Sequence, residues 1–348
     1  MSDVKVSIRN LYKVFGKEPQ EALEYVHQGL GKQELLAQHG HVLGLNNINI
    51  DIPEKKIQVI MGLSGSGKST LIRHINRLIE PTAGEVVIDG KDVLQMPMPE
   101  LRAFRQTSLS MVFQKFALLP HTTVVENAAY GLKLMGVPMG EAKERAQKWL
   151  DRVGLTGFEK SYPSQLSGGM QQRVGLARAL ATDSDILLMD EAFSALDPLI
   201  RTDMQDVLLE LQSELNKTII FITHDLDEAL RIGDDIAILR DGGMVQQGNP
   251  QEIILKPADD YVSDFIMDIN RGRVLLVKSV MKEGESGGSV EVDSGTVLEE
   301  ALQKMKADPM TPASVVEGGR KVGALHLRDM IDAIERPAPE TASGNVYR

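Results

Sequence analysis

Residues 62–70 have the residue types and the spacing of a phosphate-binding loop: glycine, four residues, glycine, lysine and a hydroxyl residue. The three glycines allow the backbone to curl so that successive N–H groups face one anion. The Lys68 ammonium can reach the outer phosphates of a nucleoside triphosphate, and the Ser69 hydroxyl can bind Mg²⁺. We assign to this loop Gly62, Leu63, Ser64, Gly65, Ser66, Gly67, Lys68, Ser69 and Thr70. The pattern predicts nucleoside triphosphate binding.

Two acids, Asp190 and Glu191, directly follow the apolar run at 186–189. The run predicts a buried strand, so the acids emerge at its carboxyl end, where open α/β sheets bind their ligands. Asp190 is suited to hold Mg²⁺, directly or through water, and Glu191 is suited to act as a general base toward an attacking water. The alternative is a strand end that only enters solvent, and the order of the motifs disfavours it.

Gln114 and His224 stand at the ends of two further predicted strands, at 109–113 and 218–223. At the carboxyl edge of a parallel strand, the Gln114 amide can reach a metal ion or an attacking water. A histidine in the same kind of position can donate a hydrogen bond to a γ-phosphate. We therefore predict catalytic roles for Lys68, Gln114, Glu191 and His224, and metal-binding roles for Ser69, Gln114 and Asp190.

The elements around the first motif fit this chemistry. The apolar run at 57–61 has the length of a buried strand, and 71–79 has apolar residues at helical spacing. The loop therefore joins a strand to a helix, and the helix N-terminus adds a partial positive charge for an anion.

A second anion-binding helix start is predicted at Ser167, Gly168 and Gly169. Ser167 is a favourable N-cap, and the two glycines expose backbone N–H groups at the start of a long helix. One triphosphate does not need two such helix ends in the same subunit. The two ends could instead meet across a dimer.

Phe15 is the one aromatic residue that we consider for the base of a nucleotide. It precedes a glycine turn, where a ring could stack on a purine, and the alternative is a core aromatic at a strand end. Residues 19–40 look like an insertion of two short helices. Three histidines fall in or beside this insertion: His27, His39 and His41. No carboxylate or thiol completes a metal site with them at ligand spacing, so solvated or capping roles are favoured.

Composition limits the classes of protein. The chain has 348 residues, enough for two domains, and its net charge of −11 argues against a general nucleic-acid binder. It has no cysteine, and no apolar run approaches the length of about 18 residues that a spanning helix needs. Its first ten residues contain no signal-peptide core. These features predict a protein that is soluble and cytosolic, or peripheral on a membrane.

The sequence changes character near residue 270. We expect a small β-α-β-β-α unit in 271–336, with strands at 274–277, 290–292, 313–316 and 322–325 and helices at 296–305 and 327–334. The polar, proline-bearing tail at 337–348 is predicted to be flexible.

Residues 1–270 resemble the nucleotide-binding subunit of ABC transporters. The phosphate loop, Gln114, LSGGMQQR, ILLMDE, SALD and His224 occur in the family's order. The resemblance implies an α/β P-loop NTPase fold: a RecA-like core, an antiparallel β subdomain and a helical subdomain at about 115–182. It also implies ATP hydrolysis with Mg²⁺ and adds Asp197 to the nucleotide-site residues.

A closer resemblance is to the glycine betaine/proline branch, which handles quaternary amines. It rests on EALEYVHQGLGKQELL, MGLSGSGKSTLIRHINRLIEPTAGEVVIDG and MDEAFSALDPLIRTDMQD, and on Ala192 where many importers have proline. The branch implies import of choline, glycine betaine, trimethylamine N-oxide or proline. The alternatives are an importer ATPase for another small polar solute, or a non-transport ABC ATPase that acts in DNA repair or translation.

The family resemblance implies an assembly. Two copies pair head to tail, and ATP lies between the loop of one copy and Ser167, Gly168 and Gly169 of the other. The dimer moves membrane permease subunits, to which a periplasmic or extracellular substrate-binding protein delivers the solute. The apolar stretch 116–120 would dock a permease helix. The chain is thus expected at the cytoplasmic face of the bacterial inner membrane, without a nucleic-acid partner.

The C-terminal unit departs from the branch. SVVEGGRKVGALHLRDMIDAI resembles the second half of a CBS-type module, but the chain has material for about one module where close relatives have two. Such modules normally pair, so the second would come from the other subunit. The expected role is to stabilise the dimer, and a regulatory ligand sensor is the alternative.

Overall fold

The computed structural model describes residues 3–194 and 196–335. The chain divides into two compact units, Met1–Gln247 and Gly248–Arg348, which are described separately. This division lies earlier than the boundary predicted at 270. Residues 248–270 contact the later part of the chain: the Gln251 amide, for example, donates to the Val274 carbonyl at 3.0 Å and accepts from the Leu276 N–H at 2.9 Å. The predicted flexible tail, 337–348, lies outside the described residues.

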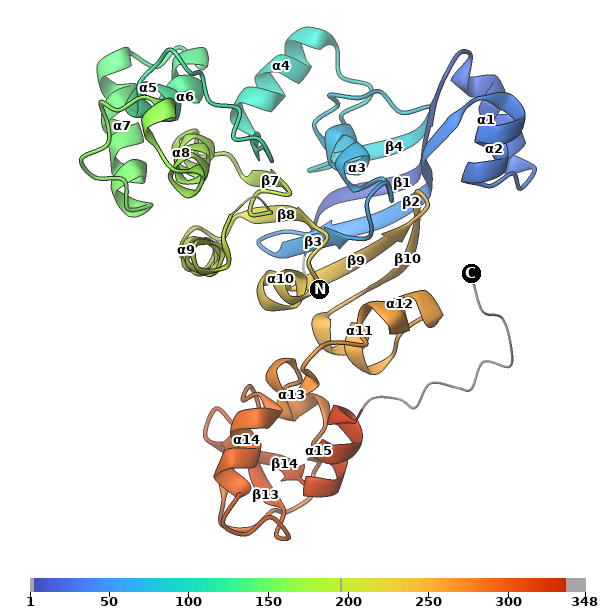
Figure 1. The fold of residues 1–348 in the computed structure, drawn as a ribbon, viewed down its shortest axis with the longest axis vertical. Coiled ribbons are helices and arrows are strands. Elements are labelled where there is room, and N and C mark those ends of the chain that lie inside the picture. Colours follow the sequence, from blue (N-terminus) through green and yellow to red (C-terminus); the bar gives the residue numbers. More distant parts are fainter. Residues whose placement is uncertain (1–2, 195, 336–348) are drawn as a thin grey trace. The chain divides into compact units, whose positions relative to one another are not determined.

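The first unit alternates strands and helices (Figure 1). Its strands are β1 (Val4–Phe15), β2 (Val42–Pro53), β3 (Ile57–Met61), β4 (Ala83–Ile88), β5 (Lys91–Asp92), β6 (Leu109–Val112), β7 (Ile186–Asp190), β8 (Thr218–Thr223), β9 (Asp235–Arg240) and β10 (Gly243–Gly248). Its helices are α1 (Pro19–His27), α2 (Lys32–His39), α3 (Lys68–Ile75), α4 (Met98–Thr107), α5 (Val124–Ala128), α6 (Tyr130–Leu134), α7 (Met139–Arg152), α8 (Gly168–Ala181), α9 (Pro198–Leu215) and α10 (Leu226–Ile232).

A six-stranded sheet in the order β10-β9-β3-β8-β7-β6 forms the centre of this unit. The pairs β9–β3, β3–β8, β8–β7 and β7–β6 are all parallel. Every residue of β3, β7 and β8 is buried, which explains why these strands are largely apolar in the sequence. Parallel pairing brings the carboxyl ends of β3, β6, β7 and β8 to one edge, the edge predicted to bind ligand.

A second, antiparallel sheet has the order β2-β1-β4-β5. Alternate residues of its long strands, such as Ile8 and Ile50, are buried and join one hydrophobic core with Ile60, Leu188 and Ile222 of the parallel sheet. Burial of this shared face is the main force that holds the two sheets together. The predicted antiparallel subdomain is thus present.

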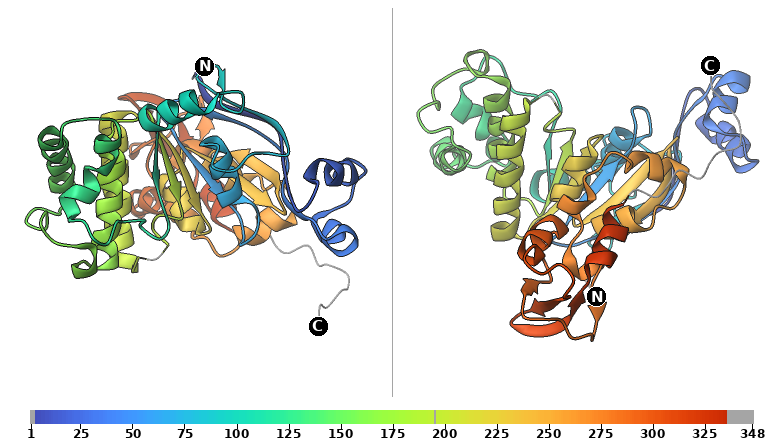
Figure 2. Two further views of the ribbon diagram at one scale, coloured as in Figure 1. Left: turned by 90° about the horizontal axis from the view of Figure 1, so that it is seen from above. Right: turned by 60° about the horizontal axis from the view of Figure 1, so that its bottom comes forward.

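Helices α5 to α8 form the helical part, and in all three views they lie on the opposite side of the two sheets from α1 and α2 (Figures 1 and 2). The fully buried Asn127 fixes the loop that leads into this part. Its amide donates to the Leu119 carbonyl at 3.0 Å, and its side-chain oxygen accepts from the Leu119 N–H at 2.7 Å.

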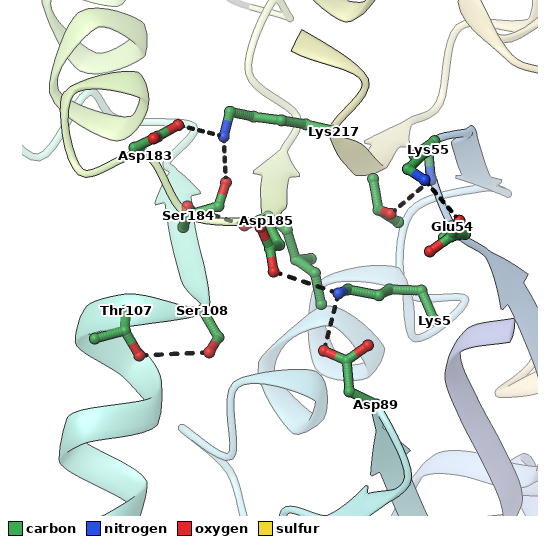
Figure 3. A network of polar contacts seen from close by, with 12 residues as sticks. Lys5, Glu54, Lys55, Asp89, Thr107, Ser108, Asp183, Ser184, Asp185 and Lys217 are labelled. Atoms are coloured by element: carbon green, nitrogen blue, oxygen red, sulfur yellow. Dashed lines mark hydrogen bonds and ion pairs between the residues drawn. The ribbon is translucent and has the colours of Figure 1, made fainter. Parts of the chain in front are cut away.

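An ion pair between Lys5 and Asp185 connects the two sheets at the edge opposite the predicted site (Figure 3). The Lys5 ammonium of β1 lies 2.9 Å from an Asp89 carboxylate oxygen and 3.4 Å from Asp185, which precedes β7. Burial opposes the charge on Lys5, but the two acids outweigh it and raise the pKa of the lysine. Next to this contact, Lys217 donates to Asp183 at 2.9 Å and to the Ser184 carbonyl at 2.7 Å.

The second unit contains a four-stranded sheet in the order β11-β14-β13-β12. Its elements are α11 (Pro250–Leu255), α12 (Asp260–Phe265), α13 (Arg271–Val274), β11 (Lys282–Glu283), β12 (Glu291–Asp293), α14 (Leu298–Met305), β13 (Ala313–Glu317), β14 (Arg320–Leu325) and α15 (Leu327–Ile334). The strand predicted at 274–277 is wrong. Val274 ends α13, Val277 begins a short 3-10 helix, and only Leu276 between them forms an isolated bridge, with Val297. The apolar run reflects the burial of Leu275 and Val277 rather than a strand.

His74 of α3 is a buried titratable group whose effect on stability can be measured. Its Nδ1 lies 2.7 Å from the Thr70 carbonyl, whereas its buried Nε2 has no hydrogen-bond partner. Burial lowers the pKa of His74 to about 4. The unfolded chain binds this proton below about pH 6.5 and the folded chain only below about pH 4, so the unfolded state binds more protons in that window. Stability therefore falls as the pH falls through it.

We expect His74→Gln to remove this part of the pH dependence. The variant keeps a donor for the Thr70 carbonyl but cannot titrate, and the full shift corresponds to about 3 kcal/mol in the free energy of unfolding. The measurement is denaturant unfolding at pH 7 and pH 4.5, followed by the fluorescence of Trp149, the chain's single tryptophan, which lies in the first unit. An equal loss of stability in both proteins would show that His74 does not titrate in this way.

Candidate nucleotide-binding site

The predicted phosphate loop connects β3 to α3 at the carboxyl edge of the parallel sheet. Two of its glycines are required by geometry. Gly62 has a φ of 149°, and a Cβ there would lie 2.2 Å from the Leu239 carbonyl oxygen. Gly67 has a φ of 103°, and a Cβ there would lie 2.6 Å from the Gly44 carbonyl oxygen. Any side chain at either position would push the loop away from the strands that shape it.

Lys68 is folded onto its own loop. Its Nζ donates to the carbonyls of Gly62 at 2.8 Å and Leu63 at 3.1 Å, and the residue is 4% exposed. Burial lowers the pKa of Lys68, whereas the nearby Glu191 and Asp190 carboxylates act in the opposite direction. An ammonium that is held by weak neutral acceptors at the centre of a curled loop is well placed to move onto a phosphate anion.

Asp190 and Ser69, two of the residues predicted to hold Mg²⁺, are in direct contact. The Ser69 hydroxyl donates to Asp190 Oδ1 at 2.8 Å, and the other carboxylate oxygen lies 3.3 Å from Nη2 of Arg73. Among the described residues, no cluster of three or more histidine, cysteine, aspartate or glutamate side chains is suited to a metal ion. The hydroxyl and carboxylate oxygens here suit Mg²⁺, which is commonly held by one or two protein groups together with substrate phosphates.

Glu191 lies where β6, β7 and β8 end. Its Oε2 accepts from Gln114 Nε2 at 2.8 Å and lies 3.7 Å from Nδ1 of His224. Its other oxygen is 3.9 Å from Lys68 Nζ. Glu191 also has a φ of 45°, a left-handed conformation that is uncommon for a residue with a side chain, so the fold holds this carboxylate against a backbone preference.

A cavity of about 320 Å³ opens over the loop and reaches Glu191. Its lining residues are Phe15, Lys32, Val42, Leu43, Gly44, Ser64, Gly65, Gly67, Lys68, Ser69, Thr70 and Glu191. Phe15 is 39% exposed, so the structure does not support the alternative of a core aromatic. The Lys13 ammonium lies 5.0 Å from the centroid of the Phe15 ring, and the ring is close enough to Gly44 to leave no room for a Cβ there.

The second predicted anion site lies elsewhere in the chain. Ser167 caps α8, its hydroxyl accepting from the Met170 N–H at 3.3 Å. Asp197 caps α9 by accepting from the Ile200 N–H at 3.1 Å. Neither of these caps, nor Gly168 or Gly169, is among the described residues that line the cavity. One chain therefore does not bring its two predicted phosphate-binding elements together.

The structure also adds residues that sequence reasoning missed. Arg73 reaches Asp190, and Lys32 of the insertion lines the cavity. The three insertion histidines pack instead of clustering: His39 stacks on Tyr25 with ring centroids 3.8 Å apart, and His27 meets Tyr12 edge-on at 5.2 Å. His41 lies within 2.7 Å of the carbonyls of His39 and Lys17.

Comparisons with known proteins agree with this geometry. The family model described as ABC transporter matches residues 45–194. The glycine betaine transport ATP-binding protein OpuAA of Bacillus subtilis is 50% identical, over 95% of this chain and 78% of that protein. ProV of Escherichia coli, a glycine betaine/proline betaine ATP-binding protein, is 49% identical over 95% of this chain and 83% of its own length.

A solved structure shows the same fold. It is the dimeric post-hydrolysis state of an ATP-binding cassette with bound ADP and phosphate. It matches with a TM-score of 0.60 at 33% identity, covering 70% of this chain and 98% of that one. Within the described residues, no helix of this chain is both long and apolar enough to cross a membrane.

The parallel sheet, the phosphate loop and the facing carboxylates define a P-loop ATPase of the ABC class. The fold and the enzyme class inferred from the sequence motifs are thereby confirmed. The chain belongs to the family of ABC transporter ATP-binding proteins, in the branch that contains the glycine betaine, proline betaine and trimethylamine N-oxide systems.

Proposed function

We propose that this chain is the ATP-hydrolysing subunit of an importer for a quaternary amine or a related osmolyte. The main support is that four side chains meet at one edge of the parallel sheet: Lys68, Ser69, Asp190 and Glu191. In addition, about half of the residues are identical to those of ATP-binding proteins from glycine betaine transport systems. Trimethylamine N-oxide is a second candidate cargo, because the TmoW protein of Pelagibacter ubique is 42% identical and this chain covers 98% of its length.

The residues in and beside the cavity bind different parts of ATP and Mg²⁺. The loop N–H groups and Lys68 hold the phosphates, and Phe15 stacks on the base. Ser69 and Asp190 hold Mg²⁺, with Gln114 within reach of the same edge. The bound ion supplies charge stabilisation at the phosphates.

Glu191 orients and deprotonates the attacking water. Gln114 donates to one of its oxygens and therefore fixes the direction of the carboxylate. His224, which is 55% exposed beside the same oxygen, donates a hydrogen bond to the terminal phosphate.

Two copies of this chain pair head to tail. The loop of one copy and Ser167, Gly168 and Gly169 of the other then enclose one ATP, with Asp197 beside it. Two facts support this arrangement: one chain does not bring the two elements together, and a cassette of the same fold has been solved as a dimer. The CBS-like module in the second unit stabilises the pair.

The dimer works at the cytoplasmic face of the membrane, against permease subunits to which a binding protein delivers the solute. We place the docking surface for a permease helix at the stretch from Phe116 to Pro120. It is partly exposed, and Arg178 holds it in shape by donating to the carbonyls of Ala117 at 2.6 Å and Phe116 at 3.0 Å. This picture includes no nucleic-acid partner.

The test of the proposed cargo is ATP hydrolysis by this chain together with its permease in liposomes that contain the binding protein. Choline, glycine betaine, trimethylamine N-oxide and proline are added separately. Stimulation by one of them identifies the cargo. Unchanged basal hydrolysis with all four would contradict the quaternary-amine proposal and would leave the ATPase assignment standing.

Phe15→Ala is expected to weaken ATP binding about tenfold, because stacking on a base contributes about 1–3 kcal/mol. The maximal rate of hydrolysis should change little, since the ring is proposed to contact the base and takes no part in activating the attacking water. Calorimetric titration with ATP measures the affinity. Phe158→Ala, which alters an exposed phenylalanine outside the cavity, is the matched control. Equal affinities for wild type and Phe15→Ala would show that the base does not contact this ring.

A further inference from the structure

A lysine of the insertion reaches the phosphate loop. Lys32 is the first residue of α2, and its Nζ donates to the Gly65 carbonyl at 2.6 Å. The half-buried side chain lines the same cavity as Phe15 and Lys68. Residues 19–40, which looked separate from the chemistry in the sequence, thus contribute a cation to the nucleotide site.

The position of Lys32 is fixed by packing. The helix pair α1–α2 has its own hydrophobic core, in which Leu23, Val26 and Leu35 are buried against Val14 of β1 and Leu43 of β2. Leu35, one turn after Lys32, is completely buried. The stacked rings of Tyr25 and His39 join the two helices a second time. Lys32 is therefore carried to the loop by a folded element that is attached to the β1–β2 hairpin.

The charge of Lys32 is not compensated by an acid. Among the described residues, no carboxylate oxygen lies within 4.0 Å of its Nζ, and the neighbouring Glu34 is occupied in accepting the Gly31 N–H at 3.0 Å. The Gly65 carbonyl uses one of the three ammonium donors. Two donors stay available at the mouth of the loop, in a chain whose net charge is −11.

We propose that Lys32 is a nucleotide-binding residue whose ammonium contacts the phosphates of the bound nucleotide, so that the insertion forms one wall of the site. This inference rests on the nucleotide site proposed above and deepens it. The contact is made within one chain, so it operates on ADP as well as ATP and does not require the dimer. It adds a charge-assisted hydrogen bond to those made by Lys68 and the loop.

The test is calorimetric titration of the full-length chain with ADP and Mg²⁺. Lys32→Met keeps most of the aliphatic stem and removes the charge. We expect about a fivefold loss of ADP affinity that shrinks when the salt concentration is raised. Lys32→Arg, which keeps the charge, should stay within about twofold of wild type. Lys17→Met, at an exposed lysine near the start of the same insertion, is the matched control and should bind as wild type does.

Several outcomes would overturn the inference. Equal ADP affinity for Lys32→Met and wild type would do so, with circular dichroism melting curves showing that both are folded. A loss that disappears when 2′-deoxy-ADP replaces ADP would assign the contact to the ribose. A defect confined to ATP-induced dimerisation, with normal ADP binding, would assign Lys32 to the subunit interface. Failure of the wild-type protein to bind ADP at all would instead contradict the proposed nucleotide site itself.

Discussion

Glu191→Gln is expected to reduce ATP turnover by two to four orders of magnitude, the range of about 10²–10⁴-fold that general base catalysis contributes. Glutamine has nearly the same size, and its side-chain oxygen can still accept the hydrogen bond from Gln114. It cannot take a proton from water at neutral pH. The phosphate-binding groups, Lys68 and the loop, are unchanged, so ATP should bind with wild-type affinity.

The measurement combines phosphate release with gel filtration in ATP. Because the variant binds ATP without cleaving it, the closed dimer should accumulate and elute ahead of the monomer. Glu85→Gln, at an exposed glutamate of β4, serves as the matched control and should turn over normally. Turnover at the wild-type rate by the Glu191 variant would show that Glu191 is not the general base. Elution of the variant as a monomer in ATP would show that ATP binding alone does not close the dimer.

The second large effect is recovery of activity on mixing two inactive variants. Lys68→Met removes the phosphate-binding ammonium. Gly168→Asp places a carboxylate at the start of α8, where a Cβ has room because its nearest neighbour, a Phe116 ring atom, lies 3.7 Å away. Each variant alone forms two damaged sites and should be inactive. A head-to-tail mixed dimer contains one site with both defects and one site with none.

Mixing the two purified variants should therefore restore ATP hydrolysis, up to about a quarter of the wild-type rate if half of the dimers are mixed and the sites act independently. The assay is phosphate release as a function of the mixing ratio, with the maximum expected at equal amounts. Mixing Lys68→Met with an equal amount of Lys68→Ala is the control and should restore nothing. Absence of recovery, despite exchange of subunits shown by differently tagged copies, would place both phosphate-binding elements in one subunit.

Much of the site was predictable because the sequence marks it with local rules. The glycine positions of the loop follow from a curled backbone, and Asp190 and Glu191 follow from the end of a buried run. Parallel pairing then brings Glu191, Gln114 and His224 to one edge, as the order of strands suggested. The roles of these residues in hydrolysis stay predictions that the variants above test.

Other features could not be predicted because they depend on contacts between distant segments. Lys32 meets Gly65 only because the α1–α2 pair packs on the β1–β2 hairpin, and no local pattern encodes that approach. The division of the chain at Gln247 likewise involves contacts between distant residues, such as the hydrogen bonds from Gln251 to residues more than twenty positions away. The apolar run at 274–277 was also mistaken for a strand, because it is buried between a helix end and a 3-10 turn and pairs only through the isolated bridge of Leu276 with Val297.

The central claim is that hydrolysis of ATP at this site drives solute import. It is tested most directly by uptake of radiolabelled glycine betaine into liposomes that contain the permease, this chain and the binding protein. We expect uptake with wild type and ATP, and none when ATP is omitted or when Glu191→Gln replaces wild type. Equal uptake with the Glu191 variant, or with no ATP, would contradict the claim that this chain powers transport.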